Sequence, residues 1–199
     1  VSRVESAMLD WAVAARGLPG EKESGDLHVV APFADGVLVG VIDGIGHGRE
    51  AAEAARIAAS VLREHASEPV LPLVARCHER LHGTRGVVLS LASFSARDRT
   101  MTWLGVGNVE GVFLRRDTSA KPSRESVPVR GGILGDRLPP LHATTLQIGI
   151  GDLVIFVPDG IESKFREGLR AELPVQEIAD RILAEYGKVT DDANPNNNR

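Results

Sequence analysis

The sequence offers little that would build a disulfide framework, a membrane anchor or a nucleic-acid surface. Its single cysteine, Cys77, cannot form an intrachain disulfide, which favours a reducing compartment, and we expect a cytoplasmic protein. No apolar run approaches the ~18 residues of a membrane span. The formal net charge is -4, so the chain has no basic field to attract nucleic acid or anionic lipid. We therefore expect neither a nucleic-acid partner nor a membrane partner.

The composition is that of a globular chain that can bury a hydrophobic core. Of its 199 residues, 43% are hydrophobic and 25% are charged, as in ordinary soluble domains. This length fits one domain. We predict a single domain over residues 1–192, followed by a polar, asparagine-rich and disordered tail over residues 193–199.

Apolar periodicity predicts three helices among many short strands. Apolar residues recur at three- and four-residue spacing over Arg49–Ala66 and Val70–Leu81, and a third helix begins near Leu173-Pro174 and ends at Gly187. The stretch Asp117–Glu125 is predicted to be a polar loop. Strands are predicted where β-branched or alternating apolar residues are bounded by turn residues, namely at Met8–Ala14, Leu27–Phe33, Val37–Ile42, Gly86–Ser95, Thr100–Gly107, Gly111–Arg116, Thr144–Ile150 and Asp152–Val157.

The connections between successive strands determine the expected fold class. Most of them are too short for a parallel crossover, so the strands are expected to pair antiparallel. Many antiparallel strands with helices in two blocks indicate an α+β protein. Two mostly antiparallel sheets packed face to face, each covered on the outside by helices, would bury every apolar face. We therefore predict a four-layer αββα sandwich.

Aspartates beside glycines stand at several points where the chain changes direction. Asp26 follows Ser-Gly, and Asp43 and Asp159 each precede a glycine directly after an apolar strand. A strand end holds a carboxylate on rigid backbone, and carboxylate oxygens are preferred by Mg²⁺ and Mn²⁺. The pair Asp191-Asp192 is a further candidate. Asp-Gly is also a common turn dipeptide, so spacing alone leaves both interpretations open.

Five motifs occur in a characteristic order along the chain. They are Ser24-Gly25-Asp26, Asp43-Gly44-Ile45-Gly46-His47-Gly48, Gly131-Gly132-Ile133-Leu134-Gly135, the run from Gly151 to Gly160 (GDLVIFVPDG), and Asp191-Asp192-Ala193. As an ordered set, they resemble bacterial PP2C-type phosphatases of the SpoIIE class. The resemblance covers the chain from about Leu9 to Ala193.

This resemblance implies an αββα sandwich with two divalent cations, Mn²⁺ or Mg²⁺, between the sheets. Asp43 would bridge both cations, Asp26 and the Gly44 carbonyl would bind one, and Asp159 and Asp191 would bind the other. Asp43, Asp26 and Asp159 would be the catalytic residues of a phosphatase in which a metal-activated water attacks a phosphoserine or phosphothreonine, without a phosphoenzyme. The same resemblance implies a phosphorylated protein as partner, namely a STAS-domain protein of the stressosome.

One alternative keeps the fold but not the turnover. After the aspartate pair, members of the SpoIIE class continue with an apolar strand, whereas this sequence reads Asn-Pro-Asn-Asn-Asn-Arg after Ala193. If Asp191 is poorly anchored, the chain is a catalytically weak, PP2C-like regulator that binds a phosphoprotein.

A more distant alternative rests on His78-Glu79-Arg80-Leu81-His82, a literal HExxH on a predicted helix. Two histidines one helical turn apart can hold zinc, with the glutamate as general base of a metalloprotease. Arg85 stands where a metzincin has glycine, and Glu110 remains as a possible third ligand. The apolar stripe of the helix, which includes Cys77, is explained by packing alone.

Overall fold

A computed structural model describes residues 9–15, 25–120, 122–126, 129–169 and 171–188. Along the chain the elements are β1 (Asp26–Phe33), β2 (Gly36–Gly44), α1 (Arg49–Glu64), α2 (Val70–Arg80), β3 (Val87–Ser95), β4 (Thr100–Val106), β5 (Glu110–Leu114), β6 (Arg124–Ser126), β7 (Thr144–Gln147), β8 (Leu153–Val157), the 3₁₀ helix η1 (Ser163–Gly168) and α3 (Val175–Tyr186).

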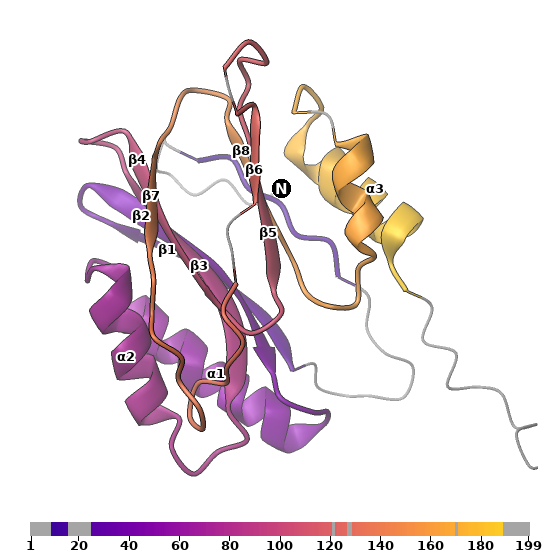
Figure 1. Ribbon diagram of the computed structural model, residues 1–199. Helices are drawn as coiled ribbons and strands as arrows, with labels where there is room; N and C mark the ends of the chain where they lie inside the picture. Colours follow the sequence, from indigo (N-terminus) through magenta and orange to yellow (C-terminus); the bar gives the residue numbers. More distant parts are fainter. Residues whose placement is uncertain (1–8, 16–24, 121, 127–128, 170, 189–199) are drawn as a thin grey trace, which may run out of the picture.

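The strands form two antiparallel sheets. The larger sheet has the strand order β1-β2-β3-β4-β7 and the smaller one β6-β5-β8. Helices α1 and α2 cover the outer face of the larger sheet, and α3 covers the smaller sheet on the opposite side of the molecule (Figure 1). The predicted α+β fold and its αββα layering are therefore confirmed.

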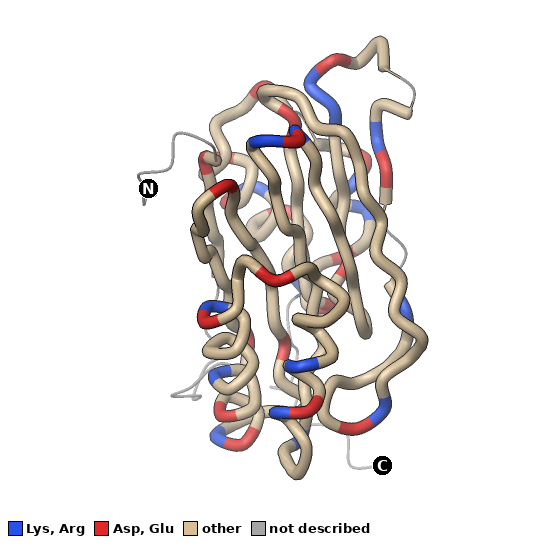
Figure 2. Tube along the Cα trace, turned by 90° about the vertical axis from the view of Figure 1, so that its left-hand side faces the viewer, with Lys and Arg blue, Asp and Glu red and all other residues tan. Residues whose placement is uncertain are grey.

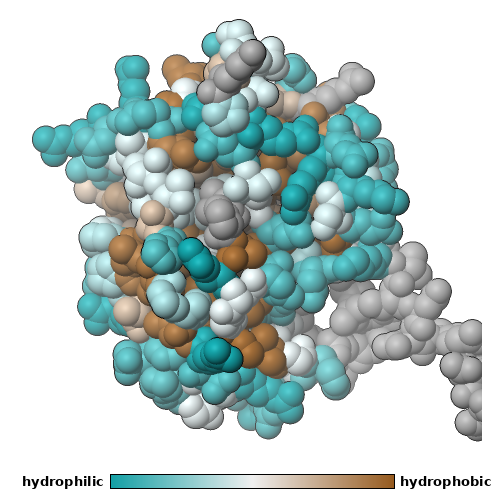
Figure 3. Space-filling model, in the orientation of Figure 1, coloured by the Kyte–Doolittle hydropathy of each residue, from teal (hydrophilic) through white to brown (hydrophobic). Residues whose placement is uncertain are grey.

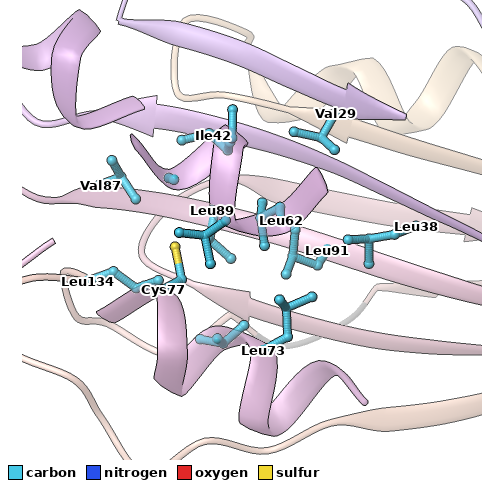
Figure 4. Close-up of a cluster of buried hydrophobic side chains, with 14 of the residues drawn as sticks. Val29, Leu38, Ile42, Leu62, Leu73, Cys77, Val87, Leu89, Leu91 and Leu134 are labelled. Atoms are coloured by element: carbon cyan, nitrogen blue, oxygen red, sulfur yellow. The ribbon is translucent and has the colours of Figure 1, made fainter. Parts of the chain in front are cut away.

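Each boundary between neighbouring layers is filled by its own apolar cluster. The cluster between α1, α2 and the larger sheet includes Leu62 and Leu89, which point toward each other in Figure 4. A second cluster, between the two sheets, includes Trp103 and Phe113. The third lies beneath α3 and includes Ile178. Burial of these apolar faces is the main force that holds the four layers together.

Close backbone approach lets the two sheets pack tightly. A Cβ atom at Gly111 on β5 would lie 1.6 Å from Cζ2 of Trp103 on β4, so only glycine leaves room for the indole. The Trp103 ring also meets Phe156 of β8 edge-on, with 4.9 Å between ring centroids. These contacts hold β4 of the larger sheet against β5 and β8 of the smaller sheet.

The predicted first strand, Met8–Ala14, is wrong for the described residues 9–15, which belong to no strand. Leu9 packs against the cluster between the sheets, and the Trp11 ring lies 5.6 Å from the ring of His28. The apolar residues of this segment are therefore explained by side-chain packing, without a hydrogen-bonded ladder.

Two short elements were not expected. Strand β6 overlaps the end of the predicted polar loop Asp117–Glu125, because pairing with β5 makes a strand of a segment that has no apolar alternation. Helix η1 follows Asp159 closely.

Strand β7 ends at Gln147, so the predicted extension to Ile150 is instead part of the turn to β8. The predicted tail, residues 193–199, lies outside the described residues.

The surface of the described residues is mixed in character. Acidic and basic residues are interspersed along the chain (Figure 2), and the face seen in Figure 3 is largely hydrophilic, with hydrophobic residues in small groups. Among the helices of the described part, none combines the length and the hydropathy that crossing a bilayer requires.

Candidate metal centre

A β-hairpin brings Asp26 and Asp43 together. A two-residue turn connects β1 to β2, so that Phe33 pairs with Gly36. Counted from this pair, the antiparallel register places Asp26 of β1 directly opposite Asp43 of β2. Directly opposed residues on antiparallel strands have Cβ atoms about 4.5–5.5 Å apart. The hairpin therefore holds two carboxyl groups side by side at its open end.

The third aspartate comes from the other sheet. Asp159 lies two residues beyond the end of β8, and its charge acts on both Asp26 and Asp43. Three of the predicted site residues thus converge where the two sheets meet. Gly44 follows Asp43 as the last residue of β2. Asp191, the remaining predicted ligand, lies outside the described residues.

The electrostatics of this cluster favour a proton or a cation over three free charges. Loss of hydration on burial, followed by repulsion from Asp26 and then from Asp159, raises the pKa of Asp43 from 3.8 to about 7. The pKa of Asp26 is also raised, first by the protein atoms that displace water from its partly accessible carboxyl and then by Asp159, against an opposing hydrogen bond with Asp43. At neutral pH an added proton or cation would therefore relieve the repulsion among these carboxyl groups.

The loop after Asp43 packs tightly against the start of α1. A Cβ atom at Gly44 would lie 2.3 Å from the Ala51 oxygen, and Gly44 N–H donates to the Gly25 oxygen at 3.1 Å. At the helix start, Gly48 has φ +77, a conformation that glycine adopts without strain. The glycines of the motif thus let the loop turn sharply from strand to helix beside the two carboxylates.

Two further residues, not identified from the sequence, hold Asp159. The Asn108 Nδ2 group donates to Asp159 Oδ2 at 3.0 Å, and Lys188 Nζ donates to the main-chain oxygen of Asp159. Asn108 stands at a strand end next to Gly107, which is the same signal that marked the aspartates. Lys188 belongs to no motif, and only the tertiary structure reveals its contact.

The histidines of the HExxH motif are engaged elsewhere. Among the His, Cys, Asp and Glu residues of the described part, only His78, Glu79 and His82 form a group of three whose ligand atoms all lie within 4.8 Å of one another. However, Gly135 N–H donates to His78 Nδ1 at 3.0 Å, and His82 Nδ1 lies 3.1 Å from the Gly135 oxygen. This pattern assigns the proton of a neutral His78 ring to Nε2 and leaves that nitrogen without a lone pair for zinc.

The possible third zinc ligand is also committed to other contacts. Glu110 accepts a hydrogen bond from Ser163 Oγ at 2.9 Å and pairs with Arg166. The geometry therefore favours a structural role for the two histidines, which tie α2 to the Gly131–Gly135 segment. The ligand atoms of Asp26, Asp43 and Asp159 do not all lie within 4.8 Å of one another.

The chain belongs to the SpoIIE family: the family model described as Stage II sporulation protein E (SpoIIE) matches residues 34–196. It is 26% identical over 168 residues to the phosphoserine phosphatase RsbX of Bacillus subtilis (strain 168), a match that spans 82% of this chain and 80% of RsbX.

Solved structures agree with this assignment. A chain from a study of the bacterial stressosome, a modular system adapted to control secondary messenger signalling, superimposes with a TM-score of 0.76 at 29% identity, over 87% of this chain and 90% of that one. RsbX in complex with magnesium gives a TM-score of 0.74 at 22% identity, over 84% and 82% of the two chains. The family resemblance and the enzyme class predicted from the motifs, a PP2C-type protein serine/threonine phosphatase, are thus confirmed.

Proposed function

We propose that the chain hydrolyses phosphoserine or phosphothreonine in a protein, with two divalent cations held by Asp26, Asp43, the Gly44 carbonyl, Asp159 and Asp191. The observation that carries this proposal is the convergence of three aspartates from two sheets, with the pKa of Asp43 raised to about 7. Such clustering of perturbed carboxyl groups is typical of functional sites.

The chemistry of the donor set fits Mg²⁺ or Mn²⁺. Hard divalent cations select carboxylate and carbonyl oxygens, and their charge relieves the repulsion that raises the pKa values of Asp26 and Asp43. When bound, such cations supply an activated water and neutralise charge on the phosphoryl oxygens. A cysteine nucleophile is not a competitor, because burial raises the pKa of the Cys77 thiol to about 12.

The path of the chain after α3 supports a role for Asp191. Lys188 N–H donates to the Gly160 oxygen at 2.8 Å, and Glu162 N–H donates to the Tyr186 oxygen at 2.8 Å. The chain thus leaves α3 alongside the residues that follow Asp159. Asp191 stands three residues beyond Lys188 in the sequence, and an extended chain of that length spans up to about 10 Å, which is compatible with the proposed role.

The proposed substrate is a phosphorylated STAS-domain protein of the stressosome. Support comes from the similarity to RsbX, a phosphoserine phosphatase, and to a chain from a stressosome study. Both similarities extend over more than four-fifths of this chain. A phosphoprotein-binding regulator without turnover is the competing proposal.

Hydrolysis of a small aryl phosphate tests the chemistry directly. We expect turnover with Mn²⁺, none with EDTA, and none in Asp43→Asn. Asp35→Asn is the matched control, because Asp35 lies in the turn at the far end of the same hairpin. Turnover retained in a folded Asp43→Asn protein would contradict the assignment, and absence of turnover with any metal would favour the regulator. A phosphorylated STAS-domain protein then tests the substrate.

A further inference from the structure

Asn108 presents an amide to the carboxylate of Asp159 from a turn that is fixed on several sides. The turn joins β4 to β5 at the edge of the candidate metal centre. Gly107 N–H donates to the Arg130 oxygen at 2.8 Å. On the other side of Asn108, Val109 is fully buried, and its oxygen accepts a hydrogen bond from Ser90 Oγ at 2.7 Å.

The residues that fix this turn leave it little freedom. Ser90 is fully buried and is the one buried polar residue in the described part of the chain. Gly107 has φ +100, and a Cβ atom there would lie 2.2 Å from a methyl carbon of Val88. The backbone on both sides of Asn108 is therefore held by buried contacts, while the Asn108 side chain itself is exposed. Such a turn can hold a side chain in one place without covering it.

We propose that Asn108 is a positioning residue that orients Asp159 for cation binding, an inference that rests on the proposed metal site. An amide N–H can only donate, so it holds Oδ2 of Asp159 at 3.0 Å and leaves Oδ1 for a cation. Partners of this kind, which hydrogen-bond a ligating carboxylate, restrict its rotation and typically contribute 10–100-fold in metal affinity.

The main chain and the side chain of Asp159 are held by different groups. Lys188 Nζ donates to its main-chain oxygen, and Asn108 donates to its side chain. Because the Asn108–Asp159 hydrogen bond is exposed, it contributes little to the stability of the metal-free protein. A purely structural role would change stability and metal binding together, whereas orientation of a ligand changes metal binding alone.

Calorimetric titration with Mn²⁺, paired with thermal melts in EDTA, tests the proposal. Asn108→Ala should raise the Mn²⁺ dissociation constant by about 10–100-fold and change the metal-free melting temperature by less than about 2 °C. Ser163→Ala is the matched control, since it removes a hydrogen bond to the neighbouring carboxylate of Glu110 without touching Asp159. It should leave the dissociation constant unchanged.

An isosteric variant adds a measurement that needs no metal. Asn108→Asp places an acceptor where Asp159 needs a donor, so in EDTA at pH 8 it should melt below Asn108→Ala. Equal melting temperatures, or a folded Asn108→Ala protein with the wild-type dissociation constant, would overturn the proposal while leaving the proposed function intact. Absence of Mn²⁺ binding in the wild type would instead overturn the metal site itself.

Discussion

Replacing Asp43 with asparagine should stabilise the metal-free protein at alkaline pH, although we expect it to abolish turnover. Asp43 shares its surroundings with Asp26 and Asp159, and its pKa rises from 3.8 to about 7. Above pH 7 the folded protein must therefore hold a charge there that burial and two neighbouring carboxylates oppose. Asparagine keeps the shape of the side chain and removes this charge.

The sign of the effect follows from proton binding in the two states. Below about pH 4 Asp43 is protonated in both the folded and the unfolded chain. Between pH 4 and 7 the folded state keeps a proton that the unfolded state has lost, so the contribution of Asp43 to the free energy of unfolding falls as the pH rises. Above pH 7 the loss is complete. The predicted gain from Asp43→Asn thus develops between pH 4 and 7.

The size of the effect is bounded by the rise in pKa. The pKa of Asp43 rises from 3.8 to about 7. At about 1.36 kcal/mol per pKa unit, this rise limits the stability lost at high pH to about 4 kcal/mol. Asp43 is only half-buried, and solvent screening reduces this to about 1–2 kcal/mol. A chain of this length gains roughly 2–4 °C in melting temperature per kcal/mol, so we expect about 2–8 °C at pH 8 and roughly a third of that at pH 5.

Circular dichroism melts in EDTA at pH 5 and pH 8 measure this directly. The wild type and Asp35→Asn should behave alike, and the excess in melting temperature of Asp43→Asn over the wild type should be clearly larger at pH 8 than at pH 5. Added Mn²⁺ should then raise the melting temperature of the wild type at pH 8 far more than that of Asp43→Asn. The reasoning is refuted if Asp43→Asn melts below the wild type at pH 8 in EDTA, or if the difference is the same at both pH values.

Three further substitutions address the scaffold and the rival site. Ser90→Ala leaves the buried Val109 oxygen without its hydrogen bond and should lower the free energy of unfolding by about 1–3 kcal/mol, measured by urea denaturation; an unchanged midpoint would contradict that role. Gly111→Ala forces a methyl group into the Trp103 ring and should cost at least about 1–3 kcal/mol in the same assay, with a loss below 0.5 kcal/mol as the contrary result. His82→Ala should keep Mn²⁺-dependent aryl phosphate hydrolysis, and loss of turnover in the folded variant would revive the HExxH motif as a functional site.

Much of the fold could be predicted because its signals are local. The apolar runs that become β2 and β3 and the helical stripe of α1 identify themselves by period, and short connections fix antiparallel pairing. Even the meeting of Asp26 and Asp43 is encoded locally, since a two-residue turn sets the register of their hairpin. The strand predicted at Met8–Ala14 was wrong because a strand and an irregular segment that packs through its side chains can carry the same apolar residues.

The residues that escaped prediction depend on contacts between distant segments. The strand end beside Gly107 marks Asn108 in the sequence, but its contact with Asp159 depends on the pairing of β5 with β8, which lie more than 35 residues apart in the chain. Lys188 likewise reaches Asp159 only because α3 returns the chain along the residues after β8. Conversely, the HExxH motif places two histidines one helical turn apart, as a zinc site requires, and the Gly135 backbone that contacts their Nδ1 atoms comes from a remote segment. The ligand roles of the aspartates, including Asp191, stay predictions.

The split origin of the three aspartates has a consequence for folding. Asp26 and Asp43 meet within one hairpin, a unit that typically forms in microseconds, whereas Asp159 joins them only once the second sheet has docked through Trp103 and Phe156. A cation that needs all three carboxylates therefore binds the docked state alone and stabilises it by mass action, by about 2.7 kcal/mol at a hundred times its dissociation constant. The cations would then cross-link the two sheets, and the first opening that metal removal makes easier is separation of the sheets, with each sheet still intact.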